Sequence, residues 1–280
     1  MVNLLTAFSN FAKNPIAEIG DYYRSPNRAN NMGEALEFYI KDLFCGTVGT
    51  KDINKKHAVY SKYFSYAGNQ NNPPDFMIRG GDAVEVKKVE SFTAGIALNS
   101  SYPKDRLYAA SPMITKDCRN CEKWKEKDLI YAVDVLKKKK LKALWFVYGD
   151  CYAAGKDTYE RIKKSISAGL AGFEGVGFSK TKELGRVNKV DPLGITYLRI
   201  RGMWHIASPM KVFNYIVKPN NEKVSAYALI LKAKYNSFPV QDRKVLEKMQ
   251  QKNFSISDVK IKSPNNPAKL LEAKLLSFTK

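Results

Sequence analysis

Residues 74–89 read Pro74-Asp75-Phe76-Met77-Ile78-Arg79-Gly80-Gly81-Asp82-Ala83-Val84-Glu85-Val86-Lys87-Lys88-Val89, and their pattern predicts a β-hairpin. Two β-prone runs, 76–79 and 83–89, flank a Gly-Gly-Asp turn. Side chains alternate between the two faces of a strand, so Glu85 and Lys87 project to the same side. The turn brings Asp75, at the start of the first run, beside Glu85. The sequence therefore predicts two carboxylates and one ammonium group that converge at one end of a sheet.

These three charges suit phosphodiester hydrolysis. Mg²⁺ prefers one or two carboxylates and retains several waters, so Asp75 and Glu85 are candidate ligands, with the main-chain carbonyl of Val86 as a further one. A bound Mg²⁺, or Mn²⁺ as a substitute, neutralises the phosphate and lowers the pKa of a coordinated water. Lys87 would orient the attacking water and stabilise the developing charge. The alternative is an ordinary hairpin whose charged face is solvated.

The spacing Pro-Asp, then Glu-x-Lys, matches the PD-(D/E)xK pattern shared by many DNA-cleaving enzymes. In such enzymes a helix before the hairpin often supplies a further glutamate. A helix is predicted over 32–44, and its Gly33-x-x-x-Glu37-x-x-Ile40 spacing makes Glu37 the candidate. Glu34 lies on the same helix face and could serve instead. Both could also be ordinary first-turn acids that the helix dipole favours.

Composition agrees with a nucleic-acid partner. The chain has 280 residues, with 47 Lys and Arg against 27 Asp and Glu, which leaves a formal charge of +20. Such a surface attracts polyanions, although a basic balance can also serve solubility alone. An apolar content of 44% rules out wholesale disorder. No apolar stretch is long enough to span a membrane, and no export signal is apparent, so we expect a cytoplasmic bacterial protein without membrane association.

Strand and helix patterns are mixed along the chain, which predicts an α/β (α+β) fold with one mixed central sheet flanked by helices. Further helices are expected over 2–14, 158–170, 242–251 and 268–277, and further strands over 129–136, 141–148, 195–206 and 226–233. We expect one domain over 1–280: a catalytic core at about 30–155, DNA-recognition elements at about 156–215, and a region 216–280 of unclear role.

The four cysteines argue against a structural zinc. Such a site needs four ligands, commonly as two closely spaced pairs, and only Cys118 and Cys121 form a pair. Cys45 and Cys151 are isolated. With no export signal, all four thiols are expected to stay reduced.

Longer strings resemble the NgoPII family of type II restriction endonucleases. They are residues 27–37, the hairpin residues already quoted, 97–103, 145–152 and 183–204, which together cover about residues 1–215 in the expected order. The resemblance implies a PD-(D/E)xK nuclease core and an Mg²⁺-dependent enzyme that cuts double-stranded DNA at a short palindrome, GGCC in that family. The catalytic roles would fall on Asp75, Glu85 and Lys87, with Glu37 in support. A DNA methyltransferase would be the functional, not physical, partner.

Candidate DNA contacts lie in two regions. Arg199 and Arg201 alternate with apolar residues, and arginine forks match guanine O6 and N7 in the major groove. Nearby polar residues add Arg186, Asn188 and, as an acceptor for cytosine N4, Asp191. The arginines could also form a solvated or salt-bridged strand face. Contacts to phosphates are expected from a second set: Asn99, Ser100, Ser101, Lys88 and Arg28.

A palindromic target is read most simply by a two-fold dimer, so a homodimer is expected with one active site per strand. Two other functions remain open at this stage. One is a repair or recombination nuclease of the same fold that reads DNA shape. The other is a basic DNA-binding protein whose hairpin is not catalytic.

Overall fold

The computed structural model describes residues 2–23, 32–69, 72–99, 101–137, 140–172, 176–182, 184–218, 223–250 and 253–280. Within these ranges the core is a mixed sheet of nine strands, in the order β1-β2-β3-β6-β7-β12-β14-β13, with β5 paired to β6. Its strands are β1 (Phe64–Tyr66), β2 (Phe76–Ile78), β3 (Ala83–Val89), β5 (Arg106–Tyr108), β6 (Glu126–Lys137), β7 (Lys140–Tyr148), β12 (Ser225–Leu231), β13 (Phe254–Lys262) and β14 (Leu270–Thr279). The expected mixed central sheet flanked by helices is confirmed.

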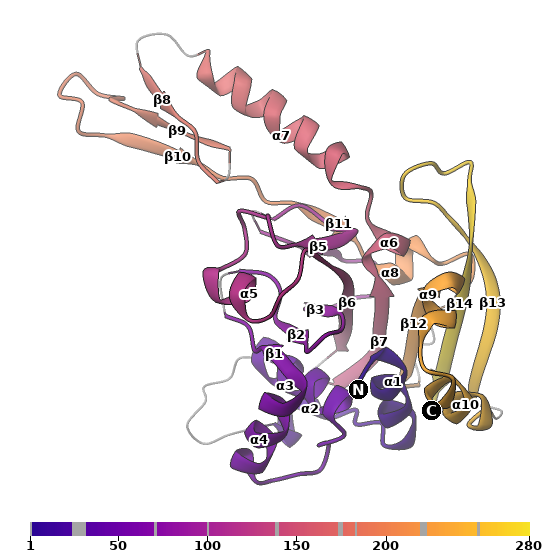
Figure 1. Ribbon diagram of the computed structural model, residues 1–280. Coiled ribbons are helices and arrows are strands. Elements are labelled where there is room, and N and C mark those ends of the chain that lie inside the picture. The colour runs from indigo at the N-terminus through magenta and orange to yellow at the C-terminus, as the bar shows by residue number, and fades with distance from the viewer. Residues whose placement is uncertain are drawn as a thin grey trace.

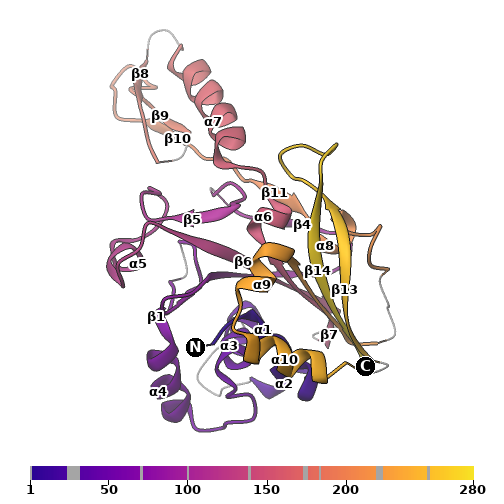
Figure 2. The same cartoon turned by 45° about the vertical axis from the view of Figure 1, so that its right-hand side comes forward.

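Helices at the N-terminal end lie together on one side of this sheet (Figures 1 and 2). They are α1 (Leu4–Lys13), α2 (Ile19–Tyr22), α3 (Met32–Cys45) and α4 (Ile53–Tyr63). Helix α1 forms because apolar residues recur at helical spacing and because the Asn3 side chain accepts from the Thr6 N–H at 3.2 Å, which caps the first turn. Helix α3 packs against α1 and β3, and it thereby places Glu37 near the predicted hairpin.

The hairpin of β2 and β3 forms as predicted, with Phe76 opposite Val84 and Met77 opposite Ala83. Strand β3 then runs parallel to β6, and β6 runs antiparallel to β7. Residues Ala143–Tyr148 of β7 are all buried, because β7 has a neighbouring strand on each side and layers over both faces. The centre of the sheet is thus the rigid support for the end of β3.

The region 216–280 completes the main sheet. Strand β12 pairs parallel to β7 and antiparallel to β14, and β13 pairs with β14. The helix expected over 268–277 is wrong, because this segment is β14. Its leucines and alanine suit a helix locally, yet pairing on both sides overrides that propensity. Strand β13 was not expected from the sequence.

Two short helices, α9 (Lys232–Ser237) and α10 (Val240–Lys248), complete this region, and α8 (Pro209–Val212) precedes it. Helix α10 lies where a helix was expected. Lys234 of α9 anchors the region to the hairpin turn, since its Nζ lies 2.7 Å from both Asp82 Oδ1 and Asp128 Oδ2.

A separate arm, residues 156–201, projects from the main body (Figures 1 and 2). It consists of α7 (Lys156–Ala171) and a three-stranded sheet of β8 (Gly177–Ser179), β9 (Gly185–Asn188) and β10 (Tyr197–Ile200). The single strand expected over 195–206 is wrong. The chain leaves β10 before Gly202 and forms β11 (His205–Ala207), which pairs with β4 (Gly95–Ala97) in a different sheet. The described residues contain no helix whose length and apolar character would let it cross a bilayer.

Candidate active site and DNA-binding arm

The hairpin leaves one edge of β3 open. Strand β2 pairs only with the first residues of β3, and in the described part of the chain no other strand pairs with the rest of β3 on that side. Asp75 lies at this edge. Its N–H donates to Val84 O at 3.0 Å, and its Oδ2 accepts from the Val86 N–H at 2.6 Å. Both the main chain and the side chain of Asp75 are therefore held against β3.

Glu85 and Lys87 project to the same side, as strand alternation requires. The Lys87 Nζ lies 2.6 Å from Glu85 Oε1. Glu85 is only 9% exposed, and its second oxygen, Oε2, is buried and has no hydrogen-bond partner among the described residues. A buried carboxylate oxygen without a partner costs free energy, so this atom is prepared for a ligand that the protein itself does not supply.

The charges at this edge act on one another. Burial, followed by the Glu85 carboxylate, raises the pKa of Asp75 to about 8, and Glu37 raises it further while Lys87 opposes the shift. Burial lowers the pKa of Lys87, but Glu85 and Asp75 outweigh that effect and leave it raised, so the amine stays protonated. Glu37 belongs to α3, and its Oε1 lies 2.6 Å from the Lys41 Nζ. The structure thus brings all four predicted charged residues together.

These residues fit a hard divalent cation. Within the described ranges no three His, Cys, Asp or Glu side chains are arranged as a ready metal cluster. Mg²⁺ does not need one, because it takes one or two carboxylates and keeps waters. Asp75 and Glu85 repel each other, and Glu85 has an unsatisfied oxygen, which are the features that a cation would relieve. Glu37 is the weaker candidate ligand because Lys41 already neutralises it.

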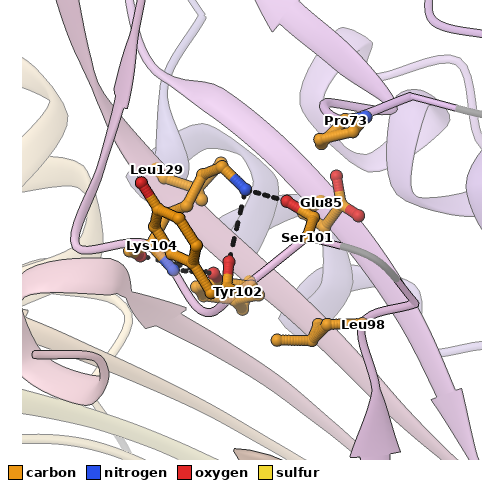
Figure 3. Close-up of a pocket in the computed structure, with 8 residues that line it drawn as sticks. Pro73, Glu85, Leu98, Ser101, Tyr102, Lys104 and Leu129 are labelled. Atoms are coloured by element: carbon orange, nitrogen blue, oxygen red, sulfur yellow. Dashed lines mark hydrogen bonds between the residues drawn. The ribbon is translucent and has the colours of Figure 1, made fainter. Parts of the chain in front are cut away.

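A pocket beside Glu85 contains a residue that sequence reasoning missed. It is lined by Pro73, Glu85, Leu98, Ser101, Tyr102, Lys104, Leu129 and Tyr131 (Figure 3). Lys104 is 8% exposed, and burial lowers its pKa to about 8 although Glu85 opposes the shift. The family-like string at 97–103 ends one residue before Lys104. Its proximity to Glu85 depends on the fold and has no local signal.

The ribbon of β9 and β10 presents a basic face. Arg186 lies directly opposite Arg199, and Asn188 opposite Tyr197, so these four side chains share one face of the sheet. The Arg186 guanidinium lies 3.8 Å from the centre of the Tyr197 ring, a cation–π contact. Asn188 donates to Ser179 Oγ on β8 at 2.8 Å. The arm as a whole carries ten Lys and Arg against five Asp and Glu.

Asp191 has a structural task in the loop between these strands. One oxygen accepts from the Leu193 N–H at 3.0 Å and the other from the Thr196 N–H at 2.6 Å. The hydrogen bond from the Thr196 side chain contributes most to lowering the pKa of Asp191, and the Thr196 N–H adds to it. Because each oxygen already accepts a main-chain hydrogen bond, Asp191 shapes the loop, and the sequence-based expectation that it accepts from cytosine N4 gains no support from this geometry.

The remaining predicted contacts are scattered. Arg201 follows the end of β10. Lys88 is exposed on β3, and its Nζ lies 3.4 Å from Glu90 Oε1. Asn99 has a positive φ of 50° and its carbonyl accepts from the Trp204 N–H, while the Ser101 hydroxyl accepts from Lys104. Ser100 and Arg28 lie outside the described residues.

The cysteine pair lies apart from this site. Cys118, on α5 (Lys116–Asn120), is buried with its Sγ 3.4 Å from Met77 Sδ, and the Cys121 thiol donates to the Cys118 carbonyl at 3.1 Å. Cys151 is buried on α6 (Gly149–Tyr152), and Cys45 is half-buried at the end of α3. Burial raises the pKa of Cys118 to about 12, so its thiol stays protonated and packs as an apolar group.

Comparison with known proteins identifies the family of this chain. A model of the NgoPII restriction endonuclease family matches residues 2–262. The chain is 49% identical over 279 residues to the type II restriction enzyme NgoPII of Neisseria gonorrhoeae, covering 99% of each chain. No solved structure matches the chain. The match extends beyond residue 215, where the sequence resemblance was expected to end, and so includes the strands that complete the main sheet.

The chain belongs to the NgoPII restriction endonuclease family. Its activity is that of a type II restriction enzyme, a site-specific endonuclease.

Proposed function

We propose that this enzyme hydrolyses phosphodiester bonds of double-stranded DNA at a short palindrome, in an Mg²⁺-dependent reaction that leaves 5′-phosphate ends. Mn²⁺ would substitute for Mg²⁺, and the family resemblance suggests GGCC as the palindrome. One observation carries the proposal: Asp75, Glu85 and Lys87 converge at the open edge of β3, and Glu85 keeps a buried oxygen without a partner.

Each residue has a distinct task in this proposal. Asp75 and Glu85 would hold the cation, and Asp75 is itself fixed by the Val86 N–H. In a strand the N–H and C=O of one residue point to the same side, so the Val86 carbonyl faces the same open edge and is a third candidate ligand. When bound, the cation supplies charge neutralisation and a more acidic water. Lys87 stays protonated and would hold the attacking water and stabilise charge on the phosphate.

The arm would read the DNA. The major groove of B-DNA admits a two-stranded β-ribbon, and the β9–β10 ribbon presents Arg186 and Arg199 from adjacent positions on one face. Asn188 and Arg201 are further candidates for base or phosphate contact.

The active site is tested by digestion of phage DNA with Mg²⁺ or EDTA, followed by sequencing of the fragment ends. The wild type should give discrete fragments with Mg²⁺ and none with EDTA. Lys87→Met should lower kcat by about 100- to 1000-fold, and Glu85→Gln should abolish cutting while specific DNA binding persists. Asp258→Asn, at an exposed position on β13, is the matched charge control. Unchanged cutting by Glu85→Gln would refute the site, whereas cutting only at branched or damaged DNA would favour the shape-reading nuclease.

A homodimer follows from the two-fold symmetry of a palindrome, with each copy cutting one strand. Light scattering on the protein with an uncleaved palindromic duplex in Ca²⁺ should give a complex with two 31.6 kDa chains per duplex. One chain per duplex would contradict this arrangement. A methyltransferase that modifies the same palindrome is the proposed functional partner, and it would protect the DNA in the digestion assay.

A further inference from the structure

Lys104 is a buried cation without an acidic partner. Its ammonium group donates to the Ser101 hydroxyl and to the Tyr102 carbonyl, the latter at 3.3 Å, and it forms no ion pair within the described ranges. Buried lysines are rare unless they are paired. Lys127 illustrates the usual arrangement: it is equally buried, but it is paired with Glu122 and donates to Gly81 O at 2.6 Å.

The main chain at Lys104 is held in place from two sides. The Tyr131 hydroxyl of β6 accepts from the Lys104 N–H at 2.7 Å and lies 3.3 Å from the Lys104 carbonyl, to which it donates. Gly149 packs so closely that a Cβ there would lie 2.4 Å from the Lys104 carbonyl oxygen. These contacts fix the start of the side chain, as a positioned functional residue requires.

The side chain reaches the pocket that Glu85 also lines (Figure 3). Figure 3 shows the Lys104 amine directed towards Ser101, with the Glu85 carboxylate beyond it. On β3 the Lys87 amine pairs with Oε1 of the same Glu85. Glu85 is therefore paired with one lysine at the sheet edge, and the pocket that it lines contains a second lysine, Lys104, that has no anion beside it among the described residues. The proposed substrate supplies such an anion in every phosphate of its backbone.

We propose that Lys104 binds a phosphate oxygen of the DNA strand being cut and positions that strand against Glu85 and Lys87. The inference rests on the proposed hydrolysis of DNA and adds a substrate contact that the PD-(D/E)xK pattern does not contain. The Ser101 hydroxyl orients the amine, which assigns Ser101 an indirect role in place of the phosphate contact expected from the sequence.

The experiment measures DNA binding by Lys104→Met and Lys104→Arg in Ca²⁺, with the cleavage rate measured in Mg²⁺. Loss of a charged hydrogen bond should weaken binding of Lys104→Met by about 10- to 100-fold. The slope of log affinity against log salt concentration should fall by about 0.9 in magnitude, as for one lost phosphate contact. Lys104→Arg keeps the charge and should retain most of the affinity. Lys127→Met is the matched control, since it removes an equally buried lysine that lies outside the pocket.

A second measurement identifies the contacted phosphate, and a uniform loss of affinity in the variant does not affect it, because it compares the effect of each phosphate replacement on two proteins. Duplexes carrying one uncharged methylphosphonate at each successive position are bound to wild type and to Lys104→Met. At the contacted phosphate the replacement should weaken wild-type binding and have no further effect on the variant, whereas at other positions the two effects should add. If Lys104→Met does not fold, the same cycle is run with Lys104→Gln, which also removes the charge.

The outcomes separate this inference from the function on which it rests. Wild-type affinity, salt slope and cleavage rate in Lys104→Met would overturn the role of Lys104 and leave the nuclease proposal intact. Additive effects at every methylphosphonate position would also overturn it and assign Lys104 to the structure of the loop. Failure of the wild type to cut DNA with Mg²⁺ would instead refute the proposed function.

Discussion

Asp134 makes stability fall as pH rises. This residue lies in β6, between Lys88 of β3 and Leu144 of β7 in the strand register. Its side chain is fully buried, and in the part of the chain that the structure describes neither carboxylate oxygen has a hydrogen-bond partner. Burial raises the pKa of Asp134 well above its ordinary value, so the folded protein holds a proton there. We predict that Asp134→Asn removes this pH dependence.

The sign and size of this pH dependence of stability follow from proton linkage. An unfolded aspartate releases its proton above about pH 3.9, whereas the folded one keeps it up to the raised pKa. Between these two values the folded state binds one more proton, so each pH unit lowers the free energy of unfolding by about 1.4 kcal/mol. The asparagine side chain of the variant does not titrate. The stability of Asp134→Asn relative to wild type should therefore increase by about 1.4 kcal/mol per pH unit in this window.

Urea denaturation at half-unit steps from pH 4.5 upwards measures this difference directly. Asp258→Asn is the control, because a hydrogen bond from Lys274 holds the pKa of the exposed Asp258 below its ordinary value, so the stability difference between this variant and wild type should stay constant above pH 4.5. The charge of Asp258 adds to the free energy of unfolding throughout this range, and this contribution is lost only when pH falls through its lowered pKa. A difference between Asp134→Asn and wild type that stays constant with pH would show that the folded carboxyl titrates normally, and the reasoning from burial would be wrong.

Two further predictions concern the anchoring of the C-terminal region and the arm. Lys234→Met should lower the free energy of unfolding by about 2–3 kcal/mol, because it leaves Asp82 and Asp128 without their shared cation. The loss should be smaller than for a fully buried ion pair, because the lysine side chain is 23% exposed. Urea denaturation measures the loss, and an unchanged midpoint would show that the two ion pairs contribute nothing to stability. Arg199→Ala should reduce discrimination between the palindrome and a one-base variant by about 1–3 kcal/mol in competition binding. The control Lys260→Ala, on β13, should leave this discrimination unchanged. Full discrimination by Arg199→Ala would show that Arg199 does not read a base.

The hairpin that carries the candidate site could be predicted because its information is local. Asp75 and Glu85 are ten residues apart, and a Gly-Gly-Asp turn with strand alternation is sufficient to place their side chains on one edge. Helix α3 was predictable for the same reason, since its apolar spacing is contained within the helix. The spacing of charged residues around the turn therefore identified Asp75, Glu85 and Lys87 as catalytic candidates. The helical spacing of apolar residues identified the helix that carries Glu37.

Contacts between distant segments could not be predicted in this way. Residues 270–279 have helix-forming composition, yet they pair with β12 and β13, and cross-strand burial outweighs a local propensity of a few tenths of a kcal/mol per residue. The strand expected over 195–206 divides because β11 finds its partner in β4, about a hundred residues earlier. Lys104 lines the same pocket as Glu85 only because Tyr131 of β6 and Gly149 at the start of α6 hold its main chain. Such pairings depend on which buried surfaces meet after the chain has folded, and no short window of sequence contains both partners.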